Sequence, residues 1–151
     1  MPNTSHSLSV LLVDDDPGDV LMIEEALEQL DSARTVYVVN DGEEALAFLR
    51  REGRFTDAPR PDVVLLDLNM PRMDGRQVLA DVKTDESLQT IPIVVFTTSQ
   101  APADVMSSYA LHANAYVTKP INLDELTEIV QRIDDFFGRV IVLPGHHPPV
   151  E

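Results

Sequence analysis

The amino-acid sequence predicts an α/β fold: a doubly wound parallel sheet of five strands with helices on both faces. Short apolar runs rich in β-branched residues alternate along the chain with segments of helical periodicity, which is the pattern of repeated strand–helix–strand units. The chain has 151 residues, of which 44% are hydrophobic. That length supports one compact domain with a substantial core, whereas two independent domains would each be small.

Five apolar runs are the predicted strands. Each is too short for a buried helix and lacks polar alternation, as expected of parallel strands that are covered on both faces. The runs are residues 10–13, 36–39, 63–66, 93–96 and 115–117.

Segments of helical periodicity lie between and after these runs. The last is the clearest, because its apolar residues recur at three- and four-residue spacing and Asn122 can cap it ahead of Glu125. The apolar faces of the first, second and last helices are Val20, Ile23, Leu27 and Leu30; Ala45, Phe48 and Leu49; and Leu123, Leu126, Val130, Ile133 and Phe137. The third and fourth helices are expected near 76–84 and 103–112, and the proline-containing stretch 54–62 is expected to be a loop.

The predicted domain covers residues 9–138, between a flexible N-terminus at 1–8 and a C-terminal extension at 139–151. The extension begins with an apolar segment, residues 140–143, that a five-stranded sheet does not require. It can fold back over the last helix or form an interface with a second copy, and patterning alone leaves both alternatives open. The final residues, 145–151, are expected to form a mobile end.

The charge balance excludes several classes of partner. There are 26 acidic and 11 basic residues, a formal net charge of -15, which repels nucleic acid and anionic lipid. The absence of cysteine excludes disulfides and thiolate metal sites. The N-terminus has no leader pattern and no stretch approaches the ~20 apolar residues that span a bilayer. We therefore expect a soluble cytoplasmic protein that binds neither nucleic acid nor membrane.

Polar residues follow four of the predicted strands. The first strand leads into Asp14-Asp15-Asp16, the third into Asp67, the fourth into Thr97 and the fifth into Thr118-Lys119-Pro120. The carboxyl ends of parallel strands meet at one edge of a sheet, so these side chains are expected to lie together. Carboxylates tolerate such crowding when they share a proton or a cation, and a site of oxygen ligands favours Mg²⁺.

This combination of side chains suits phosphoryl transfer. A carboxylate beside Mg²⁺ can attack phosphorus, while an ammonium and a hydroxyl can bind the oxygens of the transferred group. Asp67, Lys119 and Thr97 can take those three roles. Singly, each has an ordinary explanation, such as a helix cap or a surface charge; together they indicate one chemistry. The Lys119–Pro120 bond is also a candidate for cis geometry.

Four segments resemble the receiver domains of response regulators: Leu-Leu-Val-Asp-Asp-Asp at 11–16, Leu-Leu-Asp-Leu-Asn-Met-Pro-Arg-Met-Asp-Gly at 65–75, Phe-Thr-Thr-Ser at 96–99 and Tyr-Val-Thr-Lys-Pro at 116–120. The resemblance covers residues 10–138 and implies a flavodoxin-like strand order of 2-1-3-4-5. It implies that Asp67 accepts a phosphoryl group from a partner histidine kinase and that Lys119 contacts the acyl phosphate.

The same resemblance implies a metal set and a switch. Asp14, Asp15, Asp67 and the backbone carbonyl of Asn69 would arrange Mg²⁺. Thr97 and Tyr116 resemble the switch pair, in which the threonine hydroxyl moves toward the phosphate and the aromatic ring follows it. Such a protein is a phosphoacceptor in a two-component system that assists its own phosphorylation and dephosphorylation, and is not classed as an enzyme.

Two features resemble a narrower group, the small single-domain regulators that are paired with phytochrome-type histidine kinases. These are the insertion at 54–61 and the apolar tail at 136–144, and in that group the tail contributes to a homodimer. Thr98 is bulkier than the residue that many receivers carry after the switch threonine, which puts the lifetime of the phosphate in question. With no output domain in the sequence, we expect the response to pass through a protein partner.

Three alternatives have partial support in the sequence. An aspartate-nucleophile phosphatase is suggested by Asp14-x-Asp16, but the residues that follow do not fit its motif and Asp67 would have no role. A calcium-binding loop is suggested by Asp14, Asp16, Gly18 and Glu25, but Asp19 occupies the position that requires glycine. A module that binds without being phosphorylated is disfavoured by the presence of Asp67, Thr97 and Lys119.

Overall fold

The computed structural model describes residues 8–30 and 34–144 and has alternating strands and helices. The elements in chain order are β1 (Leu8–Val13), α1 (Pro17–Glu28), β2 (Arg34–Val39), α2 (Gly42–Arg50), β3 (Val63–Leu66), α3 (Gly75–Lys83), β4 (Ile93–Thr97), α4 (Pro102–Ala110), β5 (Ala115–Thr118) and α5 (Leu123–Asp135). A short 3₁₀ helix, Gly53–Phe55, follows α2, and a π-helical turn, Phe136–Val140, continues α5.

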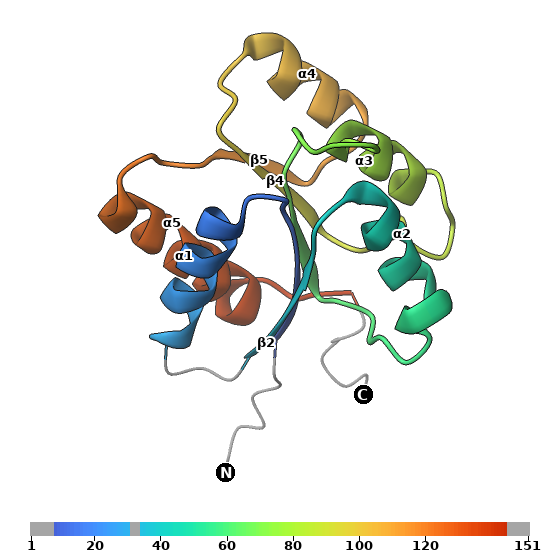
Figure 1. Ribbon diagram of the computed structural model, residues 1–151, viewed down its shortest axis with the longest axis horizontal. Coiled ribbons are helices and arrows are strands. Elements are labelled where there is room, and N and C mark those ends of the chain that lie inside the picture. The colour runs from blue at the N-terminus through green and yellow to red at the C-terminus, as the bar shows by residue number, and fades with distance from the viewer. Residues whose placement is uncertain (1–7, 31–33, 145–151) are drawn as a thin grey trace.

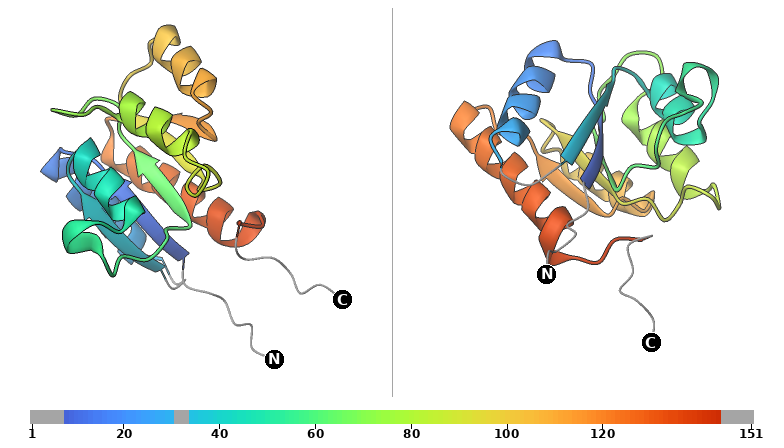
Figure 2. Two further views of the ribbon diagram at one scale, coloured as in Figure 1. Left: turned by 90° about the vertical axis from the view of Figure 1, so that its right-hand side faces the viewer. Right: turned by 90° about the horizontal axis from the view of Figure 1, so that it is seen from below.

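The five strands form one parallel sheet in the order β2-β1-β3-β4-β5, which confirms the predicted fold class and strand order. Figure 1 shows α1 and α5 on one side of the sheet and α2 and α3 on the other. Figure 2, in its view from below, shows the same three layers, with the sheet between the two groups of helices.

Each face of the sheet has its own hydrophobic core because successive side chains of a strand point to opposite faces. In β1, Val10 and Leu12 pack with the apolar residues of α1 and α5, whereas Leu11 and Val13 pack with those of α2 and α3. All four are buried. A strand covered on both faces can be apolar throughout, which explains why the strands appear in the sequence as unbroken apolar runs.

The predicted elements agree with the structure except in local detail. Every predicted strand is present, and α3 and α4 each begin one residue earlier than expected. The stretch 54–62 is not wholly a loop, because Phe55 ends a 3₁₀ helix and its ring lies 5.4 Å from that of Phe48. The expectation of a cis Lys119–Pro120 bond is wrong: the described residues contain no cis peptide bond, and trans is the more stable form of a bond before proline.

A buried ion pair that the sequence analysis did not identify joins β2 to α5. Arg34 Nε donates to Asp134 Oδ1 at 2.8 Å, and both side chains are 6% exposed. Arg34 also donates to the backbone oxygen of Leu27 at 2.5 Å. A buried charge needs a partner with good geometry, so this pair fixes the position of α5 against the sheet edge.

The segment that follows α5 folds back on the domain. Phe137 and Leu143 are buried and belong to the core on the α1 and α5 side, while Phe136, Val140 and Val142 are exposed. The segment therefore folds back over its own core, which was one expected alternative. It also leaves apolar side chains exposed, as the other alternative, an interface with a second copy, requires. The expected flexible N-terminus, residues 1–8, is wrong for Leu8, which begins β1 and is buried because it packs in the core on the α1 and α5 side. Residues 1–7, and the expected mobile end at 145–151, lie outside the described residues. Within the described ranges, the structure contains no helix that is both long and apolar enough to cross a membrane.

Candidate functional site

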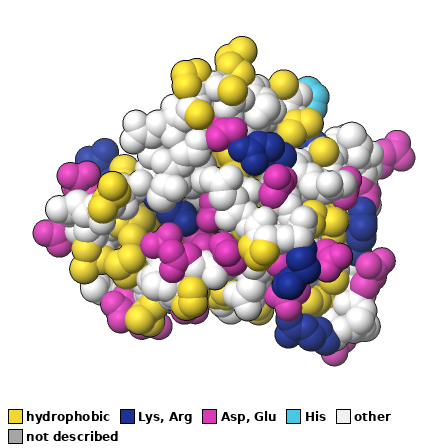
Figure 3. All heavy atoms as spheres, turned by 45° about the horizontal axis from the view of Figure 1, so that its top comes forward, with side chains coloured by type: hydrophobic (Ala, Val, Ile, Leu, Met, Phe, Trp, Pro, Cys, Tyr) yellow, Lys and Arg dark blue, Asp and Glu magenta, His cyan; other side chains and the backbone are white. Residues whose placement is uncertain are grey.

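The candidate site lies at the edge of the sheet where the carboxyl ends of the strands meet. Figure 3 brings this edge toward the viewer and shows acidic side chains gathered near the middle of the face. The backbone continues the sheet hydrogen bonding into the site: the N–H of Asp14 donates to Val39 and the N–H of Asp67 donates to Val13, at 3.2 and 3.0 Å. Both aspartates are thus held by the strands themselves.

Three carboxylates converge here. One oxygen each of Asp14, Asp15 and Asp67 lies within 4.8 Å of the others. Asp14 and Asp67 are buried and Asp15 is exposed. Burial raises the pKa of the Asp14 carboxyl above its ordinary value of 3.8, and the neighbouring charge of Asp67 adds to the effect. Crowded oxygen ligands with one open side suit a hard divalent cation, so these residues fit the expected metal.

The Lys119 ammonium is buried among carboxylates. Its Nζ lies 2.6 Å from Asp14, 3.0 Å from Asp19 and 3.4 Å from Asp67, and the side chain is 4% exposed. Burial lowers the pKa of the ammonium, but the carboxylates outweigh that effect and raise it. The backbone N–H of Lys119 donates to Thr97 at 2.7 Å. The lysine is therefore a fixed positive charge at the site.

Thr97 ends β4 with a hydroxyl that makes no hydrogen bond. The residue is fully buried. Within residues 8–30 and 34–144, its Oγ1 is the buried side-chain nitrogen or oxygen atom that lacks a partner. Leaving a buried hydroxyl unpaired costs about 1–3 kcal/mol. The hydroxyl is thus an unused donor in the strand beside Asp67.

The loop after Asp67 folds tightly over its own backbone and requires a glycine. A Cβ on Gly75 would lie 2.2 Å from the carbonyl oxygen of Asp67, and the N–H of Gly75 donates to Leu68 at 2.9 Å. Glycine is the residue that permits such a close approach. Within the same loop, the N–H of Asn69 lies 3.4 Å from Asp67 Oδ1, where it restricts the rotation of the carboxylate.

Tyr116 lies on β5, where its contacts are with the loop after Thr97 rather than with the acidic cluster. Its hydroxyl donates to the carbonyl of Ser99 at 2.9 Å, and its backbone N–H donates to the Tyr109 hydroxyl at 3.1 Å. The ring is half-buried against the core on the α2 and α3 side. Tyr116 and Thr97 are therefore connected through the three-residue segment Thr97–Ser99.

A polar network that the sequence analysis missed holds this loop. Ser99 Oγ donates to Asp104 at 2.5 Å, and Arg76 pairs with the other oxygen of Asp104. The hydrogen bond from Ser99 and the pairing with Arg76 hold the pKa of Asp104 below its usual value. The network, hereafter the α3–α4 latch, consists of Arg76, Asp104 and Ser99. No motif marks it, because its members come from three separate segments.

The structure also tests the calcium-loop alternative. Pro17 to Glu28 form α1, and Asp16 caps that helix by accepting from the N–H groups of Gly18 and Asp19. Because α1 begins at Pro17, directly after Asp16, the residues between Asp16 and Glu25 form a helix instead of the loop that such a calcium site requires. The calcium-loop alternative is therefore rejected.

A family model, a protein relative and two solved structures all relate this chain to response regulators. Residues 10–131 match the response regulator receiver domain family. The chain is 42% identical over 136 residues to the response regulator Rcp1 of Synechocystis sp., covering 90% of this chain and 92% of that protein. Its fold is similar to the crystal structure of the phosphorylated cyanobacterial phytochrome response regulator RcpA, with a TM-score of 0.89, 45% identity and coverage of 92% and 99% of the two chains. The structure of the Mn²⁺-bound form of Rcp1 matches with a TM-score of 0.86, 42% identity and coverage of 91% and 99%.

Proposed function

Because the chain belongs to the response regulator receiver family, the signalling proteins of two-component systems, we propose that a partner histidine kinase phosphorylates it on Asp67. The observation that carries the proposal is the convergence of the oxygens of Asp14, Asp15 and Asp67 beside the buried ammonium of Lys119. No single residue of this set would suffice. Together they supply a nucleophile, ligands for a cation and a positive charge in one place.

In the proposed reaction, an Asp67 carboxylate oxygen attacks the phosphorus of a phosphohistidine. An O–P bond forms while the P–N bond breaks, and its electron pair leaves with the imidazole. Asp14, Asp15, Asp67 and the backbone carbonyl of Asn69 would hold Mg²⁺, which supplies neutralising charge for the transferred group. Lys119, whose ammonium lies 3.4 Å from Asp67, donates a hydrogen bond to one phosphoryl oxygen.

The unpaired hydroxyl of Thr97 is the basis of the proposed response. A phosphoryl group on Asp67 offers the acceptor that this hydroxyl lacks in the unmodified protein. Movement of Thr97 toward it displaces the carbonyl of Ser99, to which the Tyr116 hydroxyl is bonded. A local charge is thereby converted into a change at the surface formed by α4 and β5.

The proposed kinase is of the phytochrome type. The support is the similarity along nearly the whole chain to RcpA, which is described as a phytochrome response regulator. A recessed aspartate must be reached by the histidine of another protein, and Ile121, two residues after Lys119, is 98% exposed. Together with the exposed Leu21 on α1 and Leu123 on α5, it provides apolar contacts for the kinase beside the site.

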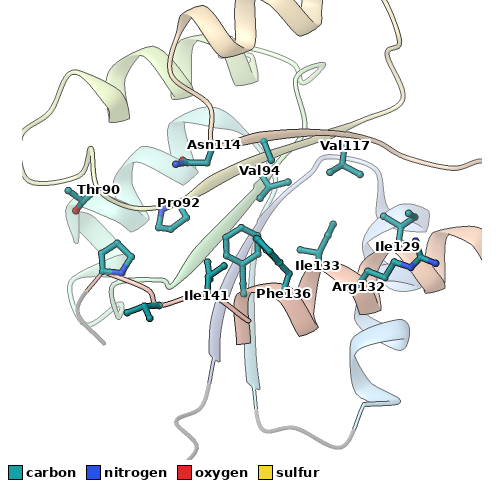
Figure 4. Close-up of a pocket in the computed structure, with 14 residues that line it drawn as sticks. Thr90, Pro92, Val94, Asn114, Val117, Ile129, Arg132, Ile133, Phe136 and Ile141 are labelled. Atoms are coloured by element: carbon teal, nitrogen blue, oxygen red, sulfur yellow. The ribbon is translucent and has the colours of Figure 1, made fainter. Parts of the chain in front are cut away.

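A homodimer through the C-terminal region is the second part of the proposal. A largely apolar cavity of about 620 Å³ lies between β4, β5, α5 and the segment after it. Figure 4 shows Ile133, Phe136 and Ile141 on one side of this hollow and Val94 and Val117 on the other. The exposed Val142 lines this cavity, and the exposed Val140 adds to the apolar surface. A second copy of the chain would cover both.

Intact-mass measurement tests the phosphorylation. Incubation with Mg²⁺ and a small phosphodonor such as phosphoramidate should add one phosphoryl group, removable by hydroxylamine because the product is an acyl phosphate. EDTA or Asp67→Asn should abolish the addition. Asp16→Asn is the matched control: it keeps the helix cap, removes a neighbouring acid, and should leave the addition intact. An adduct that persists in Asp67→Asn would refute the assignment.

A further inference from the structure

Asp19 is a fourth carboxylate at the site, and neither the metal set nor the proposed reaction uses it. It lies in the first turn of α1, and its Oδ2 accepts a hydrogen bond from Lys119 Nζ at 3.0 Å. Its side chain is 24% exposed, in contrast to the buried Asp14. It does not belong to the group of three carboxylates whose oxygens converge.

The ammonium of Lys119 has three N–H groups, and the structure directs them at three carboxylates. The shortest contact is with Asp14 at 2.6 Å, the next with Asp19 at 3.0 Å, and the longest with Asp67 at 3.4 Å. Every donor is therefore in use before any phosphoryl group arrives. Asp67, which would carry that group, makes the longest of the three hydrogen bonds with the lysine.

Phosphorylation changes what the lysine must bind, because a phosphoryl oxygen needs one of its donors. A bound cation would share the charges of Asp14 and Asp67, whereas Asp19, which lies outside the converging group, would keep its full attraction for the ammonium. We propose, on the basis of the function proposed above, that Asp19 is a positioning residue: its hydrogen bond with Lys119 keeps the ammonium away from Asp67. It thereby weakens the affinity of the site for a phosphoryl group.

A simpler role for Asp19 makes a different prediction. A carboxylate in the first turn of a helix stabilises the helix through its dipole, and that effect does not depend on Lys119. The two roles therefore separate in a double-mutant cycle, in which Asp19→Asn is measured with Lys119 present and in a Lys119→Met background.

The probe is beryllium trifluoride, a phosphoryl analogue that binds a carboxylate without group transfer. Its affinity is measured by ¹⁹F NMR in saturating Mg²⁺. Asp19→Asn should tighten binding about two- to fivefold, the range for a partly exposed ion pair, and should have no effect in the Lys119→Met background. Asp124→Asn removes an acid from the first turn of α5, where no contact with Lys119 exists in the described structure, and should leave the affinity unchanged.

Each other outcome decides against one of the proposals. Unchanged or weaker binding in Asp19→Asn overturns the role of Asp19, and so does equal tightening in the Lys119→Met background, which would indicate general charge relief. Absence of binding by the wild-type protein overturns the proposed function itself, so the two failures are distinguishable.

A second measurement needs neither metal nor analogue. In EDTA, urea unfolding of the same four proteins gives the coupling between positions 19 and 119. Asp19→Asn should lower the folding equilibrium constant about two- to fivefold more with Lys119 present than in the Lys119→Met background. Equal effects in both backgrounds would show that the carboxylate acts on the helix alone, and would overturn the proposal even where the Lys119→Met protein binds no analogue.

Discussion

At the residue scale, Thr97 suits the phosphorylated protein better than the unmodified one, whereas the donors of Lys119 are already used in the unmodified protein. Thr97 keeps an unpaired buried hydroxyl, and Lys119 is surrounded by acids. The sequence predicted Asp14, Asp67, Thr97 and Lys119 to lie together because each directly follows or ends a strand, and parallel strands bring those positions to one edge. Asp19 was not predicted as part of the site, because a helix position carries no such constraint.

Removing the Thr97 hydroxyl tests whether it is truly unpaired. Thr97→Val keeps the shape and deletes the unsatisfied group, so the free energy of unfolding should stay equal or rise by about 1 kcal/mol. Urea denaturation of the metal-free protein measures it. A loss of stability of more than about 1 kcal/mol would mean that the hydroxyl has a partner in the unmodified protein. Thr35→Val on the exposed part of β2 is the control for a change at a surface threonine.

At the scale of elements, the α3–α4 latch connects the loop after β4 to two helices. Arg76 comes from α3, Asp104 from α4 and Ser99 from the loop between β4 and α4. Periodicity predicts that these helices exist, because an apolar face identifies them. It cannot predict the latch, because which polar side chains meet depends on how the helices are turned toward each other. The buried pair of Arg34 and Asp134 escaped prediction for the same reason.

The latch should make stability depend on pH in a defined window. The hydrogen bond from Ser99 and the pairing with Arg76 lower the pKa of Asp104 in the folded protein below its ordinary value of 3.8. A depressed carboxyl pKa stabilises the fold above the unfolded value, and that contribution is lost as pH falls through the folded pKa. Asp104→Asn should therefore be less stable than wild type at neutral pH.

Urea unfolding at several pH values checks this expectation. The difference in free energy of unfolding between wild type and Asp104→Asn should be constant above about pH 5 and shrink as pH falls below about 4. Asp57→Asn, in the exposed segment after the 3₁₀ helix, serves as the control for loss of an acidic charge. A difference that stays the same down to pH 2 would show that the latch does not depend on the ionised carboxylate.

At the scale of the whole molecule, topology explains most of what was predictable. Alternating apolar runs give the parallel sheet, and the sheet gives the position of the acidic cluster. The C-terminal segment was the least predictable part, because its apolar residues divide between two environments. Leu143 is 6% exposed and Val142 is 67% exposed, although both are apolar, so residue type alone does not predict which of the two packs in the core.

Because the C-terminal segment contains both buried and exposed apolar residues, the choice of variant matters for testing the proposed dimer. Truncation after Gly138 would also remove the buried Leu143 and disturb the core, so a surface substitution is better. Val142→Asp should convert a dimer to a monomer, because a charge would have to be buried in an apolar interface. Light scattering coupled to size exclusion measures the molar mass. Met106→Asp, on the exposed face of α4, is the matched control and should keep the mass of wild type. A dimer that survives Val142→Asp would place the interface elsewhere.

The central claim is that the phosphoryl group is carried by Asp67, and chemical mapping tests it most directly. Borohydride reduces an aspartyl phosphate to homoserine, which marks the modified residue permanently and is located by peptide mass spectrometry. After treatment with a phosphodonor and Mg²⁺, homoserine should be found at position 67 and should be absent when EDTA is present. Homoserine at Asp14 or Asp15, or at no position in a protein that gains a phosphoryl group, would contradict the account.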